Sequence, residues 1–298
     1  MIENSNFNLP YYTDAYHALL SDRTSDVLGP NIRIDGRNLT VIVLSLNRTH
    51  LTVRLLRSIY EQIPCFKGKI LIGDNGSKKH ELSALKDFLF EFGTNLGVAG
   101  APNRLVAEVS TDWCMSLDND IYFISNPLHD IQQDLAILGC HFISVPLLNP
   151  DRRTLYAYGG SLMGYLERSL PRLTIRSIVP TNSDIGAVLN FTPDDRGFLK
   201  LGGFDSNMLV GFEDVDFSLR LFREGYKVGS SVALALVHDH EAPSNEAADD
   251  YERLRFSREI LRNSASYLES KTGFSIWGNE IENWLSTEHN KHGVPENL

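Results

Sequence analysis

Cysteine, basic residues and long apolar runs are all scarce in this chain, and each shortage excludes a class of protein. An odd number of cysteines in apolar surroundings predicts reduced, buried thiols and no disulfide or zinc framework: Cys65, Cys114 and Cys140. Lysine and arginine total 28 against 38 acidic residues, and the net charge of -10 argues against nucleic acid as the main partner. No apolar run approaches the ~18 residues of a membrane helix and no signal peptide begins the chain, so we expect a cytoplasmic protein without a transmembrane segment.

The chain offers instead strands that alternate with helices. Residues 39–46 form a β-branched apolar run, which is typical of a strand buried on both faces. An amphipathic helix follows and stops at Pro64. Two further strands are predicted over residues 69–73 and 113–117, with a second amphipathic helix over residues 82–92. This alternation predicts a parallel, doubly wound sheet, and such sheets bind ligands beyond the carboxyl ends of their strands.

Polar side chains follow three of these predicted strands. Asn47 comes after the first, Asp74 after the second, and Asp118-Asn119-Asp120 after the third. Two carboxylates one residue apart are costly to crowd together without a cation, and a divalent metal held there can in turn hold a diphosphate. A simple turn is the alternative, since Asp and Asn are common turn residues. Because an acidic group recurs at two strand ends on one rim, we favour a ligand site.

The second half of the chain is less regular. Residues 165–195 are polar and punctuated by proline, and they predict loops. Residues 228–237 predict an apolar strand that ends at His238-Asp239-His240. A long amphipathic helix is predicted from residue 245 to residue 271.

Residues 211–216 (GFEDVD) open another amphipathic helix with three acids in its first turn. Acidic residues there suit the helix dipole, so a capping role is one interpretation. Neighbouring residues point about 100° apart because a turn takes ~3.6 residues. With Val215 directed at the core, Asp214 is the acid best placed to meet a ligand, and Asp216 is expected to pair with Arg220 one turn on.

Taken in order and spacing, these segments resemble the family 2 glycosyltransferases with the GT-A fold, and most of all a rhamnosyl- and galactosyltransferase-like branch. The resemblance spans about residues 39–240. Each piece is short, but six of them in the same order make a specific signal. The pieces are Leu46-Asn47-Arg48, Asp74-Asn75-Gly76-Ser77, Asn95-Leu96-Gly97-Val98-Ala99-Gly100 with Asn103, Asp118-Asn119-Asp120, Gly202-Gly203-Phe204-Asp205, and Phe212-Glu213-Asp214-Val215-Asp216 with Arg220, Gly225 and His238.

The resemblance implies an α/β protein of GT-A fold, with a Rossmann-like, nucleotide-binding mixed sheet flanked by helices. An N-terminal extension is expected over residues 1–38 and the GT-A domain over residues 39–240. Within that domain, residues 39–125 form the nucleotide-sugar-binding half and residues 126–240 the acceptor half. A helical C-terminal extension is expected over residues 241–298.

The implied activity is inverting and metal-dependent, with Mn²⁺ or Mg²⁺ as cofactor. A hexosyl or deoxyhexosyl group would move from a UDP- or dTDP-type nucleoside-diphosphate sugar to a hydroxyl of a glycan or glycoconjugate, as in polysaccharide biosynthesis. Physical chemistry agrees, because the leaving diphosphate needs a cation and the hydroxyl needs a carboxylate to take its proton. The alternative is a non-catalytic GT-A-like protein that binds sugar nucleotides or acts as a scaffold, although such a module needs neither acidic cluster.

The resemblance also assigns roles to individual residues. The donor-binding residues are Asn47, Asp74, Gly97, Asn103, Asp118 and Asn119. The metal ligands are Asp120, Asp118 and His238, although His240 competes with His238 for the last place. Asp214 is the implied catalytic base, with Glu213 beside it in the acceptor pocket. The sequence departs from the pattern at Pro102, where many relatives carry a basic residue next to Asn103.

Overall fold

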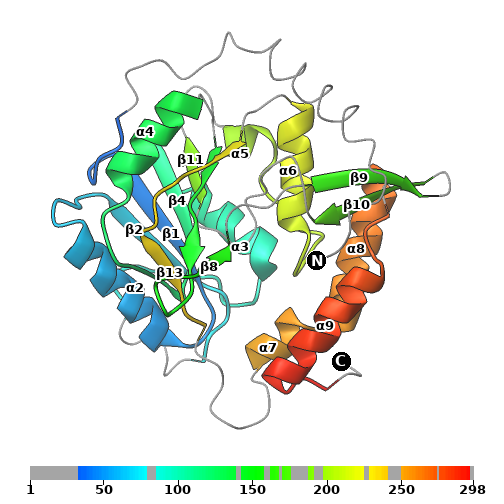
Figure 1. Ribbon diagram of the computed structural model, residues 1–298. Helices are drawn as coiled ribbons and strands as arrows, with labels where there is room; N and C mark the ends of the chain where they lie inside the picture. The colour runs from blue at the N-terminus through cyan, green and yellow to red at the C-terminus, as the bar shows by residue number, and fades with distance from the viewer. Residues whose placement is uncertain are drawn as a thin grey trace.

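A mixed β-sheet with helices on both faces organises the computed structural model of the chain (Figure 1). This arrangement confirms the predicted α/β class. The structure describes residues 33–78, 85–138, 142–157, 162–167, 170–175, 187–190, 197–224, 228–240, 250–273 and 275–295.

The large sheet has seven strands in the order β12-β6-β11-β4-β1-β2-β3. Their bounds are β1 Leu39–Ser45, β2 Lys69–Asp74, β3 Leu89–Glu91, β4 Trp113–Asp118, β6 Phe142–Ser144, β11 Ala187–Asn190 and β12 Val228–Ser230. β11 runs antiparallel to its neighbours β4 and β6, and the other pairings are parallel. From β1 the chain moves outward to β2 and β3, then adds β4 on the other side of β1. The strand order therefore reverses between β1 and β4, where open α/β sheets bind their ligands.

Each face of the sheet carries its own apolar layer. Along β1 the side chains of Val41 and Val43 join one layer and that of Ile42 joins the other, because successive residues of a strand point to opposite faces. Burial on both faces explains the continuous apolar run that predicted this strand. The covering helices are α2 Thr49–Gln62 and α4 Leu128–Leu138 on one face, and α3 Gly97–Val106, α5 Gly197–Lys200 and α6 Glu213–Arg223 on the other.

A smaller sheet and a hairpin complete the β-structure. The smaller sheet has the order β5-β13-β7-β8, and β9 pairs with β10 as an antiparallel hairpin. Their bounds are β5 Ile121–Phe123, β7 Leu147–Leu148, β8 Leu155–Ala157, β9 Leu162–Glu167, β10 Leu170–Ile175 and β13 Leu236–His238. β13 lies antiparallel to β5 with His238 opposite Ile121, so the end of β13 lies beside the residues that follow β4.

Three predicted elements of the second half were wrong. Strands β9, β10 and β11 lie within residues 165–195 or overlap them, where loops were expected, because backbone pairing of short segments needs no long apolar pattern. The strand predicted over residues 228–237 is divided into β12 and β13. The long helix predicted over residues 245–271 is also divided, since the Ser257 side chain accepts a hydrogen bond from the Ile260 N–H and caps a new helix.

The last three helices form a layer of their own: α7 Asp250–Arg255, α8 Arg258–Thr272 and α9 Asn279–His292. Its apolar core includes Leu261, Ala265 and Leu285, and it takes in Val215 from α6. α6 also contributes Phe217 to the sheet core, so it lies between the sheet and the C-terminal helices, as Figure 1 shows. The domain boundaries at residues 38, 125 and 240 stay predictions.

Two expectations for the first half also need correction. The helix predicted over residues 82–92 was wrong at its C-terminal end, where Leu89–Glu91 forms the edge strand β3; residues 79–84 lie outside the described part of the chain. Cys114 is buried as expected, but Cys65 is exposed, because it lies in the turn after α2. Cys140 lies outside the described residues.

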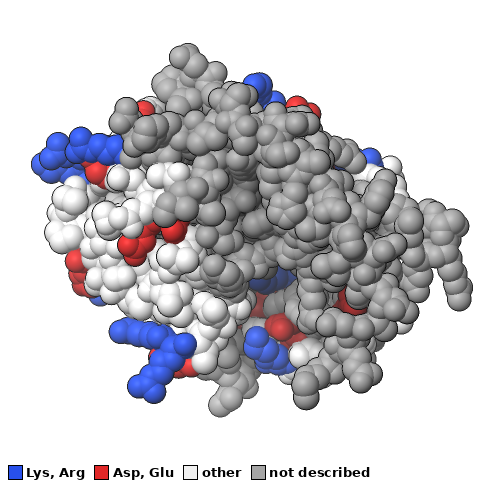
Figure 2. All heavy atoms as spheres, turned by 45° about the horizontal axis from the view of Figure 1, so that its top comes forward, with Lys and Arg blue, Asp and Glu red and all other residues white. Residues whose placement is uncertain are grey.

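On the face of the molecule that Figure 2 shows, the described residues include both Lys/Arg and Asp/Glu side chains. Among the described residues, no helix combines the length and the apolar character needed to cross a membrane.

We predict that Phe217→Ala strongly destabilises the protein. The Phe217 ring is fully buried and packs against the rings of Phe142, Phe198 and Phe204 at centroid distances of 5.8, 4.9 and 5.3 Å. Removing such a ring typically costs about 3–5 kcal/mol of unfolding free energy. Urea unfolding measures the loss, with Phe90→Ala as a control on an exposed ring of the edge strand. Equal losses in the two variants would contradict the packing described.

Candidate functional site

Three side chains meet where the strand order reverses. Asp120 follows β4 and is buried, and His238 and His240 come from the end of β13. The Asp120 Oδ2 atom lies 2.8 Å from His240 Nδ1 and 3.3 Å from His238 Nε2. The His238 ring also stacks on the ring of Tyr156, with 4.1 Å between centroids. The β5–β13 pairing thus brings together residues about 120 positions apart in the chain.

These three residues, the Asp120 cluster, have the donor atoms of a divalent-metal site. One ligand atom from each lies within 4.8 Å of the others. Asp120 Oδ1 is buried and receives no hydrogen bond from any described residue. A buried acceptor left in this way costs roughly 1–3 kcal/mol, and a cation beside it would offset that cost. Carboxylate oxygen and imidazole nitrogen are both ordinary metal ligands, so the residues present fit a divalent ion.

The charges within the cluster favour an ionised carboxylate. Burial opposes ionisation of Asp120, but hydrogen bonds and charge from His238 and His240 outweigh it and lower the pKa of Asp120. Burial also opposes protonation of His238, yet Asp120 and Asp118 outweigh it and raise the pKa of His238. A metal ligand must be deprotonated, so Asp120 is already in the form that binds a cation.

The other two residues of the predicted motif take different positions. Asp118 is exposed at the end of β4, close enough for its charge to act on His238. The Asn119 side chain donates a hydrogen bond of 3.3 Å to the hydroxyl of Thr52 on α2. The predicted donor-binding and metal-binding roles of Asp118 and the donor-binding role of Asn119 stay predictions.

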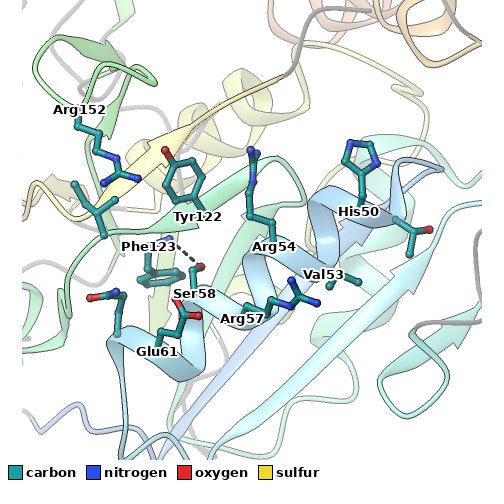
Figure 3. Close-up of a pocket in the computed structure, with 12 residues that line it drawn as sticks. His50, Val53, Arg54, Arg57, Ser58, Glu61, Tyr122, Phe123 and Arg152 are labelled. Carbon is teal, nitrogen blue, oxygen red and sulfur yellow. Dashed lines mark hydrogen bonds between the residues drawn. The ribbon is translucent and has the colours of Figure 1, made fainter.

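Arg54 of α2 supports the cluster from the outside. Its guanidinium contacts the Asp239 carboxylate at 2.7 Å and donates to the Asp239 carbonyl oxygen at 3.0 Å. The same group lies over the Tyr122 ring, 4.8 Å from its centroid, and Arg152 lies 5.6 Å from it. Figure 3 shows these three side chains at a groove between α2 and β5. By fixing Asp239, Arg54 restrains the backbone that carries both histidines.

The ends of β1 and β2 are tied into one turn. Buried Asp74 accepts a hydrogen bond of 2.9 Å from the Ser77 N–H. The Asn47 N–H donates to the Ser77 hydroxyl at 2.7 Å, and the Asn47 side-chain oxygen accepts from the Lys78 N–H at 3.0 Å. The structure thus brings Asn47 and Asp74 to one rim through Ser77. Their donor-binding roles stay predictions.

Gly97 and Asn103 contact the loop that precedes α6. Gly97 has a φ of 74°, and a Cβ there would lie 2.4 Å from the Leu209 carbonyl oxygen, so only glycine fits. Asn103 exchanges two hydrogen bonds with the Phe204 backbone, at 2.8 and 2.9 Å. These contacts give both residues a structural role, and their predicted contact with a donor is untested.

The acids of α6 divide into two groups. Asp216 is buried between Arg220 and Lys271, at 2.8 and 2.7 Å, which confirms the expected pair with Arg220. Val215 faces the core as predicted, and Asp214 is also largely buried. Asp216 is therefore committed to an ion-pair network, and Asp214 and Glu213 stay the candidates for chemistry.

A second group of charged side chains adjoins the Asp120 cluster, and no sequence pattern predicted it. Arg48, Glu252 and His292 come from the start of α2, from α7 and from α9, and they meet at His240. Arg48 stands in the predicted motif, but Glu252 and His292 occupy ordinary positions of amphipathic helices, where charged side chains are usually exposed.

A family model described as "Glycosyl transferase family 2" matches residues 40–193, just over half of the 298 residues. The chain belongs to glycosyl transferase family 2. The recognition made from the sequence is thereby confirmed. Comparison with curated proteins gives no match.

Solved structures of similar shape support the fold of this family 2 member. The mannosyltransferase PcManGT from Pyrobaculum calidifontis, in complex with GDP-Man and Mn²⁺, is 18% identical with a TM-score of 0.53 over 96% of this chain and 80% of that one. GalNAc-T7 with UDP, GalNAc and Mn²⁺ is 14% identical with a TM-score of 0.54 over 97% of this chain and 64% of that one. Both have the GT-A fold, so the predicted fold is confirmed.

We predict that Asp205, in the loop before α6, adds to the acid sensitivity of the protein. Burial opposes its ionisation, but hydrogen bonds from Lys271, Asn207 and Tyr267 outweigh it and lower the pKa of Asp205 from 3.8 to about 2. A carboxyl whose pKa is depressed on folding stabilises the protein above its unfolded pKa, and this stability is lost as the pH falls through the folded pKa.

Asp205→Asn should therefore flatten the dependence of unfolding free energy on pH between about 4 and 2. Urea unfolding at several pH values measures the slope. Glu108→Gln, which alters an exposed side chain near the end of α3, should leave the slope unchanged. A slope equal to that of the unaltered protein in Asp205→Asn would refute the assignment.

Proposed function

We propose that this chain transfers a sugar from a nucleoside-diphosphate donor to a hydroxyl of a glycan or glycoconjugate, with inversion at the anomeric carbon. The observation that carries the proposal is the Asp120 carboxylate, buried at the reversal of strand order with one oxygen unsatisfied. A cation bound at that oxygen would offset the cost of its burial, and a diphosphate is the ligand that would share such a cation.

The donor would lie across the carboxyl ends of β1, β2 and β4. Asp74 and Asn47 would meet the nucleoside, with Asp118 and Asn119 nearer the ribose and diphosphate. UDP- and dTDP-type donors are the expected class, and the GDP-Man complex of the mannosyltransferase neighbour adds GDP donors to those worth testing. The transferred group would be a hexosyl or deoxyhexosyl residue.

Asp120 and His238 would hold Mn²⁺ or Mg²⁺, with Asp118 as a further ligand. The Mn²⁺ complexes of both structural neighbours support a divalent ion. When bound, such an ion stabilises the negative charge that develops on the leaving diphosphate. Asp120 contributes to this by staying ionised while buried, which its two histidines ensure.

Asp214 would accept the proton of the acceptor hydroxyl while the hydroxyl oxygen forms its bond to the anomeric carbon. The bond to the diphosphate breaks on the opposite face, so the configuration inverts. Asp214 is mostly shielded from water, which favours direct proton transfer to a carboxylate within hydrogen-bond reach. Phe212, just before it, adopts a left-handed backbone with φ 68°. Such strain in a residue without glycine's freedom is typical of functional sites.

We predict that Asp120→Ala abolishes the extra stabilisation that Mn²⁺ adds to a bound nucleotide. Thermal unfolding with UDP, dTDP or GDP, with and without Mn²⁺, measures it; a ligand at a hundredfold its Kd adds about 2.7 kcal/mol. Asp112→Ala, at the other end of β4, is the matched control and should behave as the unaltered protein. If Asp120→Ala keeps the full effect of Mn²⁺, Asp120 is no metal ligand.

We predict that Asp214→Asn binds nucleotide and Mn²⁺ normally yet turns over at least about a hundredfold more slowly, as expected for loss of a general base. Release of UDP or GDP from nucleotide sugars gives the rate. Glu213→Gln tests the neighbouring acid in the same assay. Near-normal turnover in Asp214→Asn, together with loss in Glu213→Gln, would transfer the role of base to Glu213. Absence of turnover with every donor in the unaltered protein would favour a non-catalytic member of the family.

A further inference from the structure

We infer that His240 is a positioning residue for Asp120 and not a metal ligand, and that its ring is set by Arg48, which Glu252 of the C-terminal helices holds in place. The inference rests on the proposed function, and it assigns the layer of C-terminal helices, through Glu252 of α7, a part in the proposed metal site. The evidence for this role is the set of atoms that the two ring nitrogens of His240 contact.

The two ring nitrogens of His240 face different side chains, Asp120 on one side and Arg48 on the other. Its Nδ1 lies 2.8 Å from Asp120 Oδ2, and a carboxylate can only accept, so Nδ1 carries the proton. Its Nε2 lies 3.4 Å from Arg48 Nη1, and a guanidinium can only donate, so Nε2 accepts. Both nitrogens of His240 are therefore used within the protein. His238 meets Asp120 through Nε2 at the longer distance of 3.3 Å, which leaves it the better placed to bind a metal.

Glu252 fixes the guanidinium that orients His240. Its Oε1 accepts from Arg48 Nη2 at 2.8 Å, and its side chain is fully buried. Arg48 also donates through Nη1 to the carbonyl oxygen of His240 at 3.2 Å. The planar guanidinium thus holds both the ring and the backbone of His240 while its other nitrogen is held by Glu252. A buried pair with several hydrogen bonds is the arrangement in which an ion pair gives a definite geometry.

The backbone conformation of Arg48 also indicates that its side chain has a specific role. Arg48 and Asn47 have φ values of 48° and 53°, in the left-handed region that is unfavourable for a residue with a Cβ. That backbone forms the sharp turn from β1 into α2, and it directs the Arg48 side chain at Glu252, 204 residues further along the chain. A strained residue tied to a buried, distant partner is more consistent with a functional constraint than with a simple turn.

His292 of α9 closes the group on its outer side. Its Nδ1 lies 3.5 Å from Glu252 Oε1, and its ring packs edge-on against His240 with centroids 5.6 Å apart. His240, Glu252 and His292 alone have the ligand spacing of a metal site. The Arg48 guanidinium, however, lies against both Glu252 and His240, and its positive charge opposes a second cation there. We therefore assign His240, Glu252 and His292 to the support of the Asp120 cluster and not to a second metal site.

Three contacts in series orient the Asp120 carboxylate. Glu252 holds Arg48, Arg48 holds the His240 ring, and His240 holds Asp120 Oδ2. With Oδ2 held by His240, the buried Oδ1 is left to face a cation. Residues that orient a metal ligand in this way typically change metal affinity about 10–100-fold when they are altered. Glu252→Gln, which keeps the shape but removes the charge, should weaken Mn²⁺ binding in the presence of UDP by that factor.

The test uses the full chain and measures Mn²⁺ affinity with saturating UDP by electron paramagnetic resonance. Glu288→Gln is the matched control, because Glu288 contacts the other nitrogen of His292, Nε2, at 3.2 Å and lies away from His240. Its Mn²⁺ affinity should equal that of the unaltered protein. Arg48→Lys keeps the charge but cannot hold Glu252 and His240 together, so it should also weaken Mn²⁺ binding. Arg48→Lys replaces Glu252→Gln if the latter fails to fold, which its circular dichroism spectrum shows.

A nitrogen-edited NMR spectrum of the metal-free protein gives a second readout, which a merely structural role would not move. The Nδ1–H tautomer of His240 is expected in the unaltered protein and in Glu288→Gln. In Glu252→Gln the Arg48 guanidinium no longer holds the His240 ring against Asp120, so Nε2–H should appear beside Nδ1–H. An Nε2–H tautomer in the unaltered protein, or unchanged Mn²⁺ affinity in a folded Glu252→Gln, overturns the inference. If the unaltered protein binds no Mn²⁺ with UDP, dTDP or GDP, the proposed metal dependence fails instead, and the tautomer still decides the role of His240.

Discussion

A negative charge held out of water is the constraint on which this site depends. Removing a carboxylate such as Asp120 from solvent costs several kcal/mol unless nearby groups compensate it. The compensation comes from two histidines, and they reach Asp120 because β13 pairs with β5 in a fixed register. Arg54 and Arg48 then hold the backbone and one ring of that pair. The smaller sheet, α2 and α7 are thus arranged around a single carboxylate.

α6 connects this arrangement to the rest of the molecule. Its Phe217 packs in the sheet core and its Val215 in the C-terminal core, while Asp216 joins Arg220 and Lys271. The helix therefore cannot shift relative to one core without disturbing the other. This restraint fixes the first turn of the helix, where Asp214 lies.

The ends of β1, β2 and β4 were predictable, because a strand buried on both faces leaves a continuous apolar run and the polar residue after it is conspicuous. The pairing of Asp216 with Arg220 was predictable for a similar reason, since helical spacing alone brings them together. Strand β3 was not, because the spacing of Leu89 fits a helix equally well. The burial of Glu252 was not predictable either, because its partner Arg48 is 204 residues away and no local pattern can indicate such a pair.

The contact between Arg48 and Glu252 also has a consequence for the order of events during synthesis. The first strand and the motif after β4 leave the ribosome well before α7, and the two ends of this contact are 204 residues apart. The Rossmann-like half can pair its strands early, since those contacts are closer in sequence. His240 acquires its neighbours from α7 and α9 only after residues 250–292 have emerged. A nascent chain would therefore pair β1, β2 and β4 before His240 had the contacts that orient it beside Asp120, so the Asp120 cluster would take its final form later than the strand that carries it.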